Sequence, residues 1–122
     1  MRSLITLACC LCLPLSSIYS GVVGTYHVNG GNSDGTTYKG TLVVKKSGEI
    51  YQSQWELSDG SSTGTGVRKG NYIAFDFIGV DSEDNPLFGV QLYEIGKGGL
   101  KRGPWTVNGE GTRGYEIAKK KK

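Results

Sequence analysis

Cysteine and histidine are nearly absent from this 122-residue sequence. Its three cysteines, Cys9, Cys10 and Cys12, all lie in the first twenty residues. Residues 21–122 therefore can form no disulfide, thiolate nucleophile or cysteine metal site. His27 is the only histidine, and without a G-x-S-x-G motif it gives little support to a Ser-His-Asp hydrolase. We predict a protein that is not an enzyme, with no catalytic residues, no cofactor and no metal.

A hydrophobic run long enough for a membrane-spanning helix is also missing. The longest mainly apolar stretch, residues 4–15, is shorter than the roughly 20 residues that such a helix needs. It follows Arg2 and precedes small residues ending at Ser20, a pattern typical of a secretory signal peptide over residues 1–20. Cleavage after Ser20, with Ser17 as the less favoured site, predicts a secreted or periplasmic protein. The alternative is a lipoprotein signal in which Cys10 is retained and acylated.

Residues 21–118 have no large excess of charge of either sign. The sequence holds 14 Lys and Arg against 11 Asp and Glu, but five of the basic residues are Arg2 and Lys119–Lys122. Residues 21–118 then carry a net charge of −2. This balance argues against a nucleic-acid partner. We predict that residues 119–122 form a disordered lysine tail.

Glycine, in contrast, is abundant, and all 20 glycines follow Ser20 without a G-X-Y period. Glycine-rich turns separate segments in which apolar and polar residues alternate with the period of a β-strand. The short links require antiparallel neighbours, and closure of the sheet would remove its exposed edges. We predict that residues 21–118 form an all-β, eight-stranded antiparallel up-and-down barrel, a lipocalin-like or avidin-like meander, with a β-sandwich as the alternative. The strands are expected over 22–28, 37–46, 49–57, 62–68, 71–78, 87–95, 100–107 and 111–118.

Alternation also assigns inward faces to several strands. For residues 87–95 two faces stay open, one with Phe88, Val90 and Leu92 and the other with Leu87, Tyr93 and Ile95. A filled interior is favoured over a hollow one, and a hollow one would have a pocket lined by Trp55, Phe75 and Trp105. The outward residues are expected to be polar, which argues against a membrane-spanning barrel. The expected inward residues are Tyr51, Ser53, Trp55, Leu57, Ile73, Phe75 and Phe77, with Tyr26, Trp105 and Tyr115 as further aromatic candidates.

Two polar loops are the candidate partner-binding sites, because recognition residues on rigid barrels commonly lie in loops. They span residues 29–36 and 79–86. Their candidate residues are Asn32, Asp34, Asp81, Glu83, Asp84 and Asn85. The acidic loop lacks the spacing of an EF-hand, so a solvated loop is favoured over a calcium site. The carboxylate pairs Glu56 with Glu94 and Asp76 with Glu116 would have to approach each other to act as acid and base.

Four glycine–aromatic or glycine–apolar motifs follow one another along much of the chain. They are G-x-Y-x-V-x-G from Gly24, D-G-x-x-Y-x-G from Asp34, G-V-x-x-Y from Gly89 and L-x-x-G-x-W from Leu100. Together they resemble a group of small exported bacterial β-barrel proteins that are sometimes labelled fibronectin-binding. Gly24-x-Tyr26 also resembles the glycine–aromatic strand starts of lipocalins and avidins.

From the residues and this resemblance, we expect a non-catalytic binding module. It would engage a protein or an envelope or matrix macromolecule, such as fibronectin, through the barrel loops. The alternative is a carrier of a small apolar ligand in an internal pocket. The oligomeric state stays open.

Overall fold

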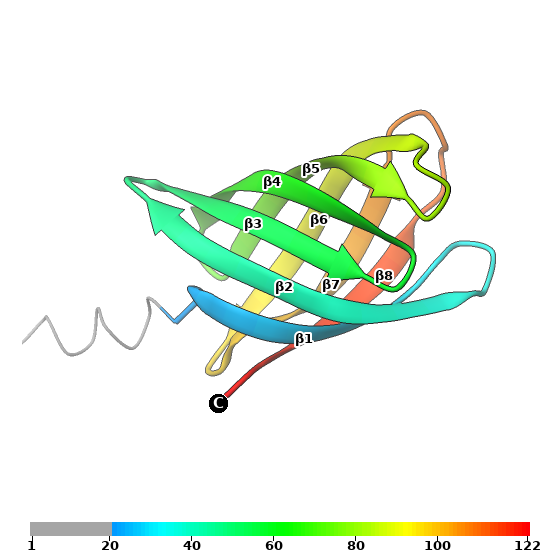
Figure 1. Ribbon diagram of the computed structural model, residues 1–122. Coiled ribbons are helices and arrows are strands. Elements are labelled where there is room, and N and C mark those ends of the chain that lie inside the picture. The colour runs from blue at the N-terminus through cyan, green and yellow to red at the C-terminus, as the bar shows by residue number, and fades with distance from the viewer. Residues whose placement is uncertain (1–20) are drawn as a thin grey trace, which may run out of the picture.

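Glycine-marked turns divide the chain into eight antiparallel strands that close into one barrel in sequence order, as the computed structural model shows (Figure 1). The structure describes residues 21–122, so the predicted signal peptide, its cleavage site and Cys10 lie outside the described residues. The predicted barrel is confirmed, because β1 pairs with both β2 and β8 and leaves no free sheet edge. The strands are β1 (Gly24–Gly31), β2 (Thr37–Ser47), β3 (Ile50–Leu57), β4 (Gly60–Lys69), β5 (Tyr72–Asp81), β6 (Pro86–Gly96), β7 (Gly99–Val107) and β8 (Gly114–Lys120).

The last strand extends further than the sequence analysis predicted. Lys119 and Lys120 pair with His27 and Tyr26 of β1, and the Lys121 amide donates to the Thr25 carbonyl over 2.8 Å. The predicted tail is therefore corrected, because at least its first two lysines belong to the sheet. The reason is closure: the backbone of β1 needs hydrogen-bond partners along its outer edge, and a strand can supply them whatever its side chains are.

Alternating side chains of the strands fill the barrel. Tyr51, Ser53 and Trp55 of β3 are buried, as predicted, and so are Ile73 and Phe75 of β5. The open question for β6 is settled by burial of Gln91 and Tyr93, which places Leu87 on the inward side as well.

The outer face of the same strand is apolar rather than polar. Phe88 and Val90 of β6 are 51% and 47% exposed, and Ile78 of β5, the register partner of Phe88, is 65% exposed. The expected polar exterior is thus found on β3 but not on this part of the wall. Within residues 21–122 no helix has the length and apolar character needed to cross a membrane.

The two ends of the barrel differ. The short β2–β3, β4–β5 and β6–β7 turns lie at one end (Figure 1), which we call the closed end because the segment before β1 packs into it. Val22 is fully buried there, and the Tyr26 hydroxyl donates to the Val22 carbonyl over 2.7 Å while accepting from the Leu100 amide at 3.2 Å. At the open end lie the β1–β2, β3–β4, β5–β6 and β7–β8 connections, including the longer loops.

Three cross-strand pairs of glycine and an aromatic residue shape the interior. The pairs are Gly30 with Tyr38, Gly66 with Phe75, and Gly114 with Trp105, and each is a direct register partnership. A Cβ on any of these glycines would lie 2.1 to 2.6 Å from the partner's ring. Glycine is required because the ring lies over the backbone of the neighbouring strand. Tyr38 and Trp105 are placed near the open end in this way, and Phe75 deeper in the barrel.

Candidate functional site

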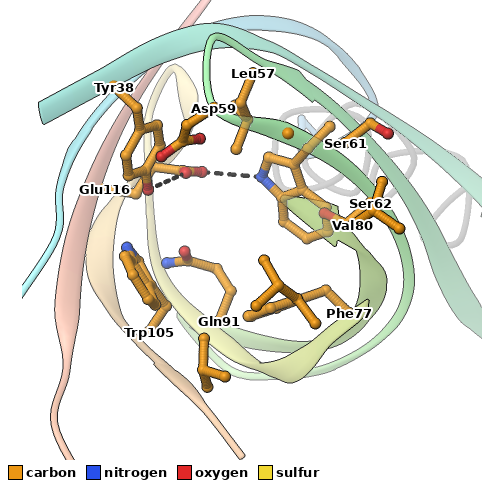
Figure 2. A pocket seen from close by; sticks show the side chains of 14 residues that line it. Tyr38, Leu57, Asp59, Ser61, Ser62, Phe77, Val80, Gln91, Trp105 and Glu116 are labelled. Atoms are coloured by element: carbon orange, nitrogen blue, oxygen red, sulfur yellow. Dashed lines mark hydrogen bonds between the residues drawn. The ribbon is translucent and has the colours of Figure 1, made fainter. Parts of the chain in front are cut away.

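A pocket of about 100 Å³ lies inside the open end of the barrel. Figure 2 shows its labelled residues arranged around a common opening, with Glu116 and Tyr38 on one side and Phe77 and Val80 on another. The walls are mainly apolar, and the carboxyl groups of Glu116 and Asp59 lie on the same side as Tyr38, across the opening from Ser61 and Ser62 (Figure 2). The lining residues are Tyr38, Trp55, Leu57, Asp59, Gly60, Ser61, Ser62, Phe77, Val80, Leu87, Gln91, Trp105, Val107 and Glu116.

Glu116 is the central polar residue of this site. Its Oε1 accepts a hydrogen bond from the Tyr38 hydroxyl at 2.6 Å, and its Oε2 accepts from Trp55 Nε1 at 3.0 Å and from the Tyr93 hydroxyl (Figure 2). The side chain is only 2% exposed. Three donors from three other strands therefore hold one buried carboxyl group at the floor of the pocket.

Burial controls the acidity of this cluster. Loss of solvent raises the pKa of Glu116 above 4.5, although the hydrogen bonds from Tyr38, Tyr93 and Trp55 act in the lowering direction. Burial, reinforced by the nearby Glu116 charge, raises the pKa of both tyrosines, Tyr38 and Tyr93. The tyrosines therefore stay protonated and act as hydrogen-bond donors, and the titrating member of the cluster is the carboxyl group.

A pH dependence of stability follows from the raised pKa of Glu116. Between the unfolded value, near 4.5, and the folded value, the native state binds the proton more tightly than the unfolded state does. The contribution of Glu116 to the free energy of unfolding is thus fully present below pH 4.5 and is lost as the pH rises through the folded pKa. Urea unfolding from pH 4.5 to neutral pH should show a decline in the wild type that is absent in Glu116→Gln. Parallel profiles would contradict this assignment.

Trp105 contributes a second polar feature to the pocket. Its Nε1 is buried and makes no hydrogen bond of good geometry among residues 21–122, although the Tyr38 hydroxyl lies close enough for this N–H to act on the pKa of Tyr38 in the lowering direction. The ring lies against Gly114 and is tilted by 58° to the ring of Tyr38, with 6.2 Å between centroids. A buried N–H without an acceptor costs about 1–3 kcal/mol. The group therefore favours any occupant that brings an acceptor atom to it.

The predicted pocket residues are only partly brought together. Trp55 and Trp105 line the opening, as the hollow-barrel alternative expected, but Phe75 does not. Phe75 is fully buried deeper in the barrel, and its ring meets Trp55 edge-on with 5.8 Å between centroids. The barrel is thus filled at the closed end and hollow at the open end, a combination of the two alternatives.

Sequence reasoning missed the polar members of the site. Glu116 and Gln91 point inward, whereas Tyr115, an expected interior residue, is 44% exposed. Gln91 is held by donating to the carbonyls of Leu92 at 2.8 Å and Gly103 at 3.2 Å. The available signal was the glycine–aromatic pairing: Gly114 must face Trp105 across the strands, which places Glu116, two residues later, on the same inward face.

The candidate binding loops form the rim of this same opening. Asp34 Oδ1 accepts from the Thr36 hydroxyl at 2.6 Å and from its amide at 2.9 Å, and these bonds lower the pKa of Asp34. In the β5–β6 loop, Asp81 Oδ1 accepts from the amides of Glu83 and Asn85, both at 2.9 Å, and its pKa is lowered likewise. Asp34 and Asp81 thus stabilise their own turns.

The other loop candidates are placed around the same rim. Asn32 Nδ2 donates to Thr36 Oγ1 at 2.9 Å and reaches Asp59 Oδ2 at 3.5 Å, which links two loops. Glu83 and Asp84 are exposed. In residues 21–122 no three His, Asp or Glu side chains are grouped so that they could hold a metal ion. Binding of a macromolecule by these loops stays a prediction.

The two proposed carboxylate pairs are not brought together. Glu56 lies near the open end of β3, whereas Glu94 lies near the closed end of β6, 3.7 Å from Arg102. Asp76 is exposed on the outer wall and accepts from the Thr65 amide at 2.8 Å, whereas Glu116 faces the interior. His27 is exposed on β1. Neither pair can therefore share a substrate.

No protein-family model and no curated protein matches this chain. Among solved structures, the chain is similar to one described as a redesigned beta barrel, with a TM-score of 0.67 and 17% sequence identity. That similarity covers 86% of this chain and 96% of the redesigned barrel. It supports the barrel fold and carries no information about function.

Proposed function

We propose that the protein binds a small, largely apolar molecule in the open end of its barrel. The observation that carries this proposal is the pocket of about 100 Å³ with mainly apolar walls, among which the buried Trp105 N–H lacks a hydrogen bond of good geometry. Pockets that combine apolar walls with a few converging polar groups are the usual form of small-molecule sites. Of the two functions considered from the sequence, the geometry supports the ligand carrier better than the loop-binding module.

The chemistry of the lining restricts the ligand. A volume of about 100 Å³ admits a group of roughly one aromatic ring, with the rest of the molecule projecting through the mouth. Trp55 and Phe77 offer ring edges and faces for aromatic contact. Trp105 favours a ligand with a hydrogen-bond acceptor, and the carboxyl groups of Asp59 and Glu116 disfavour an anion. We therefore expect a neutral or cationic aromatic ligand with one acceptor atom rather than a fatty acid.

Tryptophan fluorescence tests this proposal, because both tryptophans of the chain line the pocket. A matched set of probes has the same ring and differs only in its polar group: 4-methylbenzyl alcohol, 4-methylbenzylamine, 4-methylbenzoate and p-xylene. We expect a saturable change with the alcohol, whose oxygen can accept a hydrogen bond from Trp105 Nε1, and none with the benzoate. The responses to p-xylene and to the amine should be weaker, because p-xylene has no polar group and the amine is an ammonium ion at neutral pH and has no acceptor. Equal responses to all four would contradict the proposed site.

A variant that fills the pocket with a larger side chain gives the decisive test. Leu87→Phe adds bulk at a lining position and should weaken binding of the alcohol at least about tenfold, or about 1.4 kcal/mol. Leu92→Phe is the matched control, since Leu92 lies on the same strand and is partly exposed on the outer wall. Unchanged binding in Leu87→Phe, with the fold intact by circular dichroism, would overturn the proposal.

A further inference from the structure

The charged side chains of the barrel are separated along its axis. Within three residues of the strand termini at the closed end lie eleven basic residues and only two acidic ones, Glu49 and Glu94. The small net charge of residues 21–122, +2 from 13 basic and 11 acidic residues, conceals this separation, because acidic residues at the other end offset the basic ones. The basic residues are Lys45, Lys46, Arg68, Lys69, Lys97, Lys101, Arg102, Lys119, Lys120, Lys121 and Lys122, and we call this set the basic end.

The open end has the opposite sign. Lys39 and Arg113 are the only basic residues near it in the described chain. The acidic residues around it are Asp34, Glu56, Asp59, Asp81, Glu83, Asp84 and Glu110, with Glu116 buried in the pocket below them. An anionic surface would therefore attract the closed end and repel the mouth of the pocket, which orients the whole molecule.

The cations of the basic end are arranged in a ring around the barrel axis rather than along a line. They come from β2, β4, the β6–β7 turn, β7 and β8, and so surround the barrel axis (Figure 1). A linear polyanion would need cations along one line, whereas a planar array of charge can meet the whole ring. Several exposed apolar side chains lie at the same end: Val23 at 43%, Ile50 at 38% and Tyr72 at 54%. Cations together with shallow apolar groups match the headgroup region of a bilayer.

We propose that the basic end docks the barrel on an anionic phospholipid bilayer and leaves the mouth of the pocket facing away from it. Contact is peripheral and electrostatic, with Val23, Ile50 and Tyr72 entering the headgroup region. This inference rests on charge placement and is independent of the ligand in the pocket.

Vesicle sedimentation tests the proposal with residues 21–122, the product of the cleavage predicted after Ser20. Vesicles of phosphatidylcholine mixed with phosphatidylglycerol should bind it, and vesicles of phosphatidylcholine alone should not. Raising the salt from about 0.15 M to about 1 M shortens the screening length from about 8 to about 3 Å and should release the protein. Binding that is equal on both vesicles or insensitive to salt would overturn the proposal.

Two double variants separate the ring from the C-terminus. Lys69→Gln with Lys97→Gln removes two cations of the turns, and Lys121→Gln with Lys122→Gln removes two at the chain end. Each pair should weaken vesicle partitioning about twenty-five-fold, at about fivefold per lysine. Lys39→Gln with Arg113→Gln is the control pair at the open end and should not weaken it.

Loss confined to the C-terminal pair would overturn docking by the ring. Binding of a heparin-type polyanion without binding of anionic vesicles would overturn the bilayer as the partner. All variants should keep the fluorescence response of the pocket, so a failure here is distinguishable from a failure of the ligand proposal.

Discussion

Replacement of Glu116 by leucine is expected to lower the free energy of unfolding by about 4 kcal/mol, although leucine is the more apolar residue. The reason is the set of donors that converge on the carboxyl group: Tyr38, Tyr93 and Trp55. Leucine leaves all three without an acceptor in a buried site, and each unsatisfied donor costs about 1–3 kcal/mol. Urea unfolding monitored by circular dichroism measures the loss.

Companion variants distinguish this mechanism from general sensitivity of the barrel. Glu56→Leu, at an exposed position of β3, should change stability by no more than about 0.5 kcal/mol. Adding Tyr38→Phe and Tyr93→Phe to Glu116→Leu removes two of the stranded hydroxyl groups together with their acceptor. That triple variant should recover part of the stability, because replacing a whole buried polar group of residues by apolar ones can be close to neutral. A triple variant less stable than Glu116→Leu alone would contradict the explanation.

The fold could be predicted from the sequence because its main determinants are local. Alternation in residues 51–57 and 73–77 gave the correct inward faces, and short glycine turns allowed only antiparallel neighbours. The end of β8 could not be predicted in this way. Four consecutive lysines suggest a solvated tail. Lys119 and Lys120 nevertheless pair with β1, because the backbone groups of β1 need hydrogen-bond partners, and this tertiary effect cannot be read from the local sequence.

The site was less predictable, since its important residues break the simple rule that apolar side chains point inward. In β8 the apolar residues Tyr115 and Ile117 face outward and Glu116 faces inward. The cause is the glycine–aromatic pairing of Gly114 with Trp105, which sets the inward side of the strand before hydrophobicity is considered. The separation of basic and acidic residues along the barrel axis could not be predicted from the sequence either, because the prediction requires knowing which turns lie at the same end of the barrel.

The second large effect concerns that pairing directly. Gly114→Ala is expected to destabilise the barrel by about 3 kcal/mol and to abolish the fluorescence response to 4-methylbenzyl alcohol. A Cβ at this position would lie 2.2 Å from Cζ2 of Trp105 and 2.5 Å from the Gly31 carbonyl oxygen. The indole must move, and overpacking of this kind costs about 1–3 kcal/mol. Because Trp105 forms a wall of the pocket, its displacement changes the site as well as the fold.

Gly31→Ala is the matched control, since Gly31 lies at the end of the neighbouring strand β1 and a Cβ there has nothing within 4 Å. Its stability and its fluorescence response should match the wild type. Trp105→Phe combined with Gly114→Ala provides the second arm, because the smaller ring can withdraw from the new methyl group and should restore part of the lost stability. If Gly114→Ala were as stable as Gly31→Ala, close contact between the Trp105 ring and the β8 backbone could not be what positions this wall of the pocket.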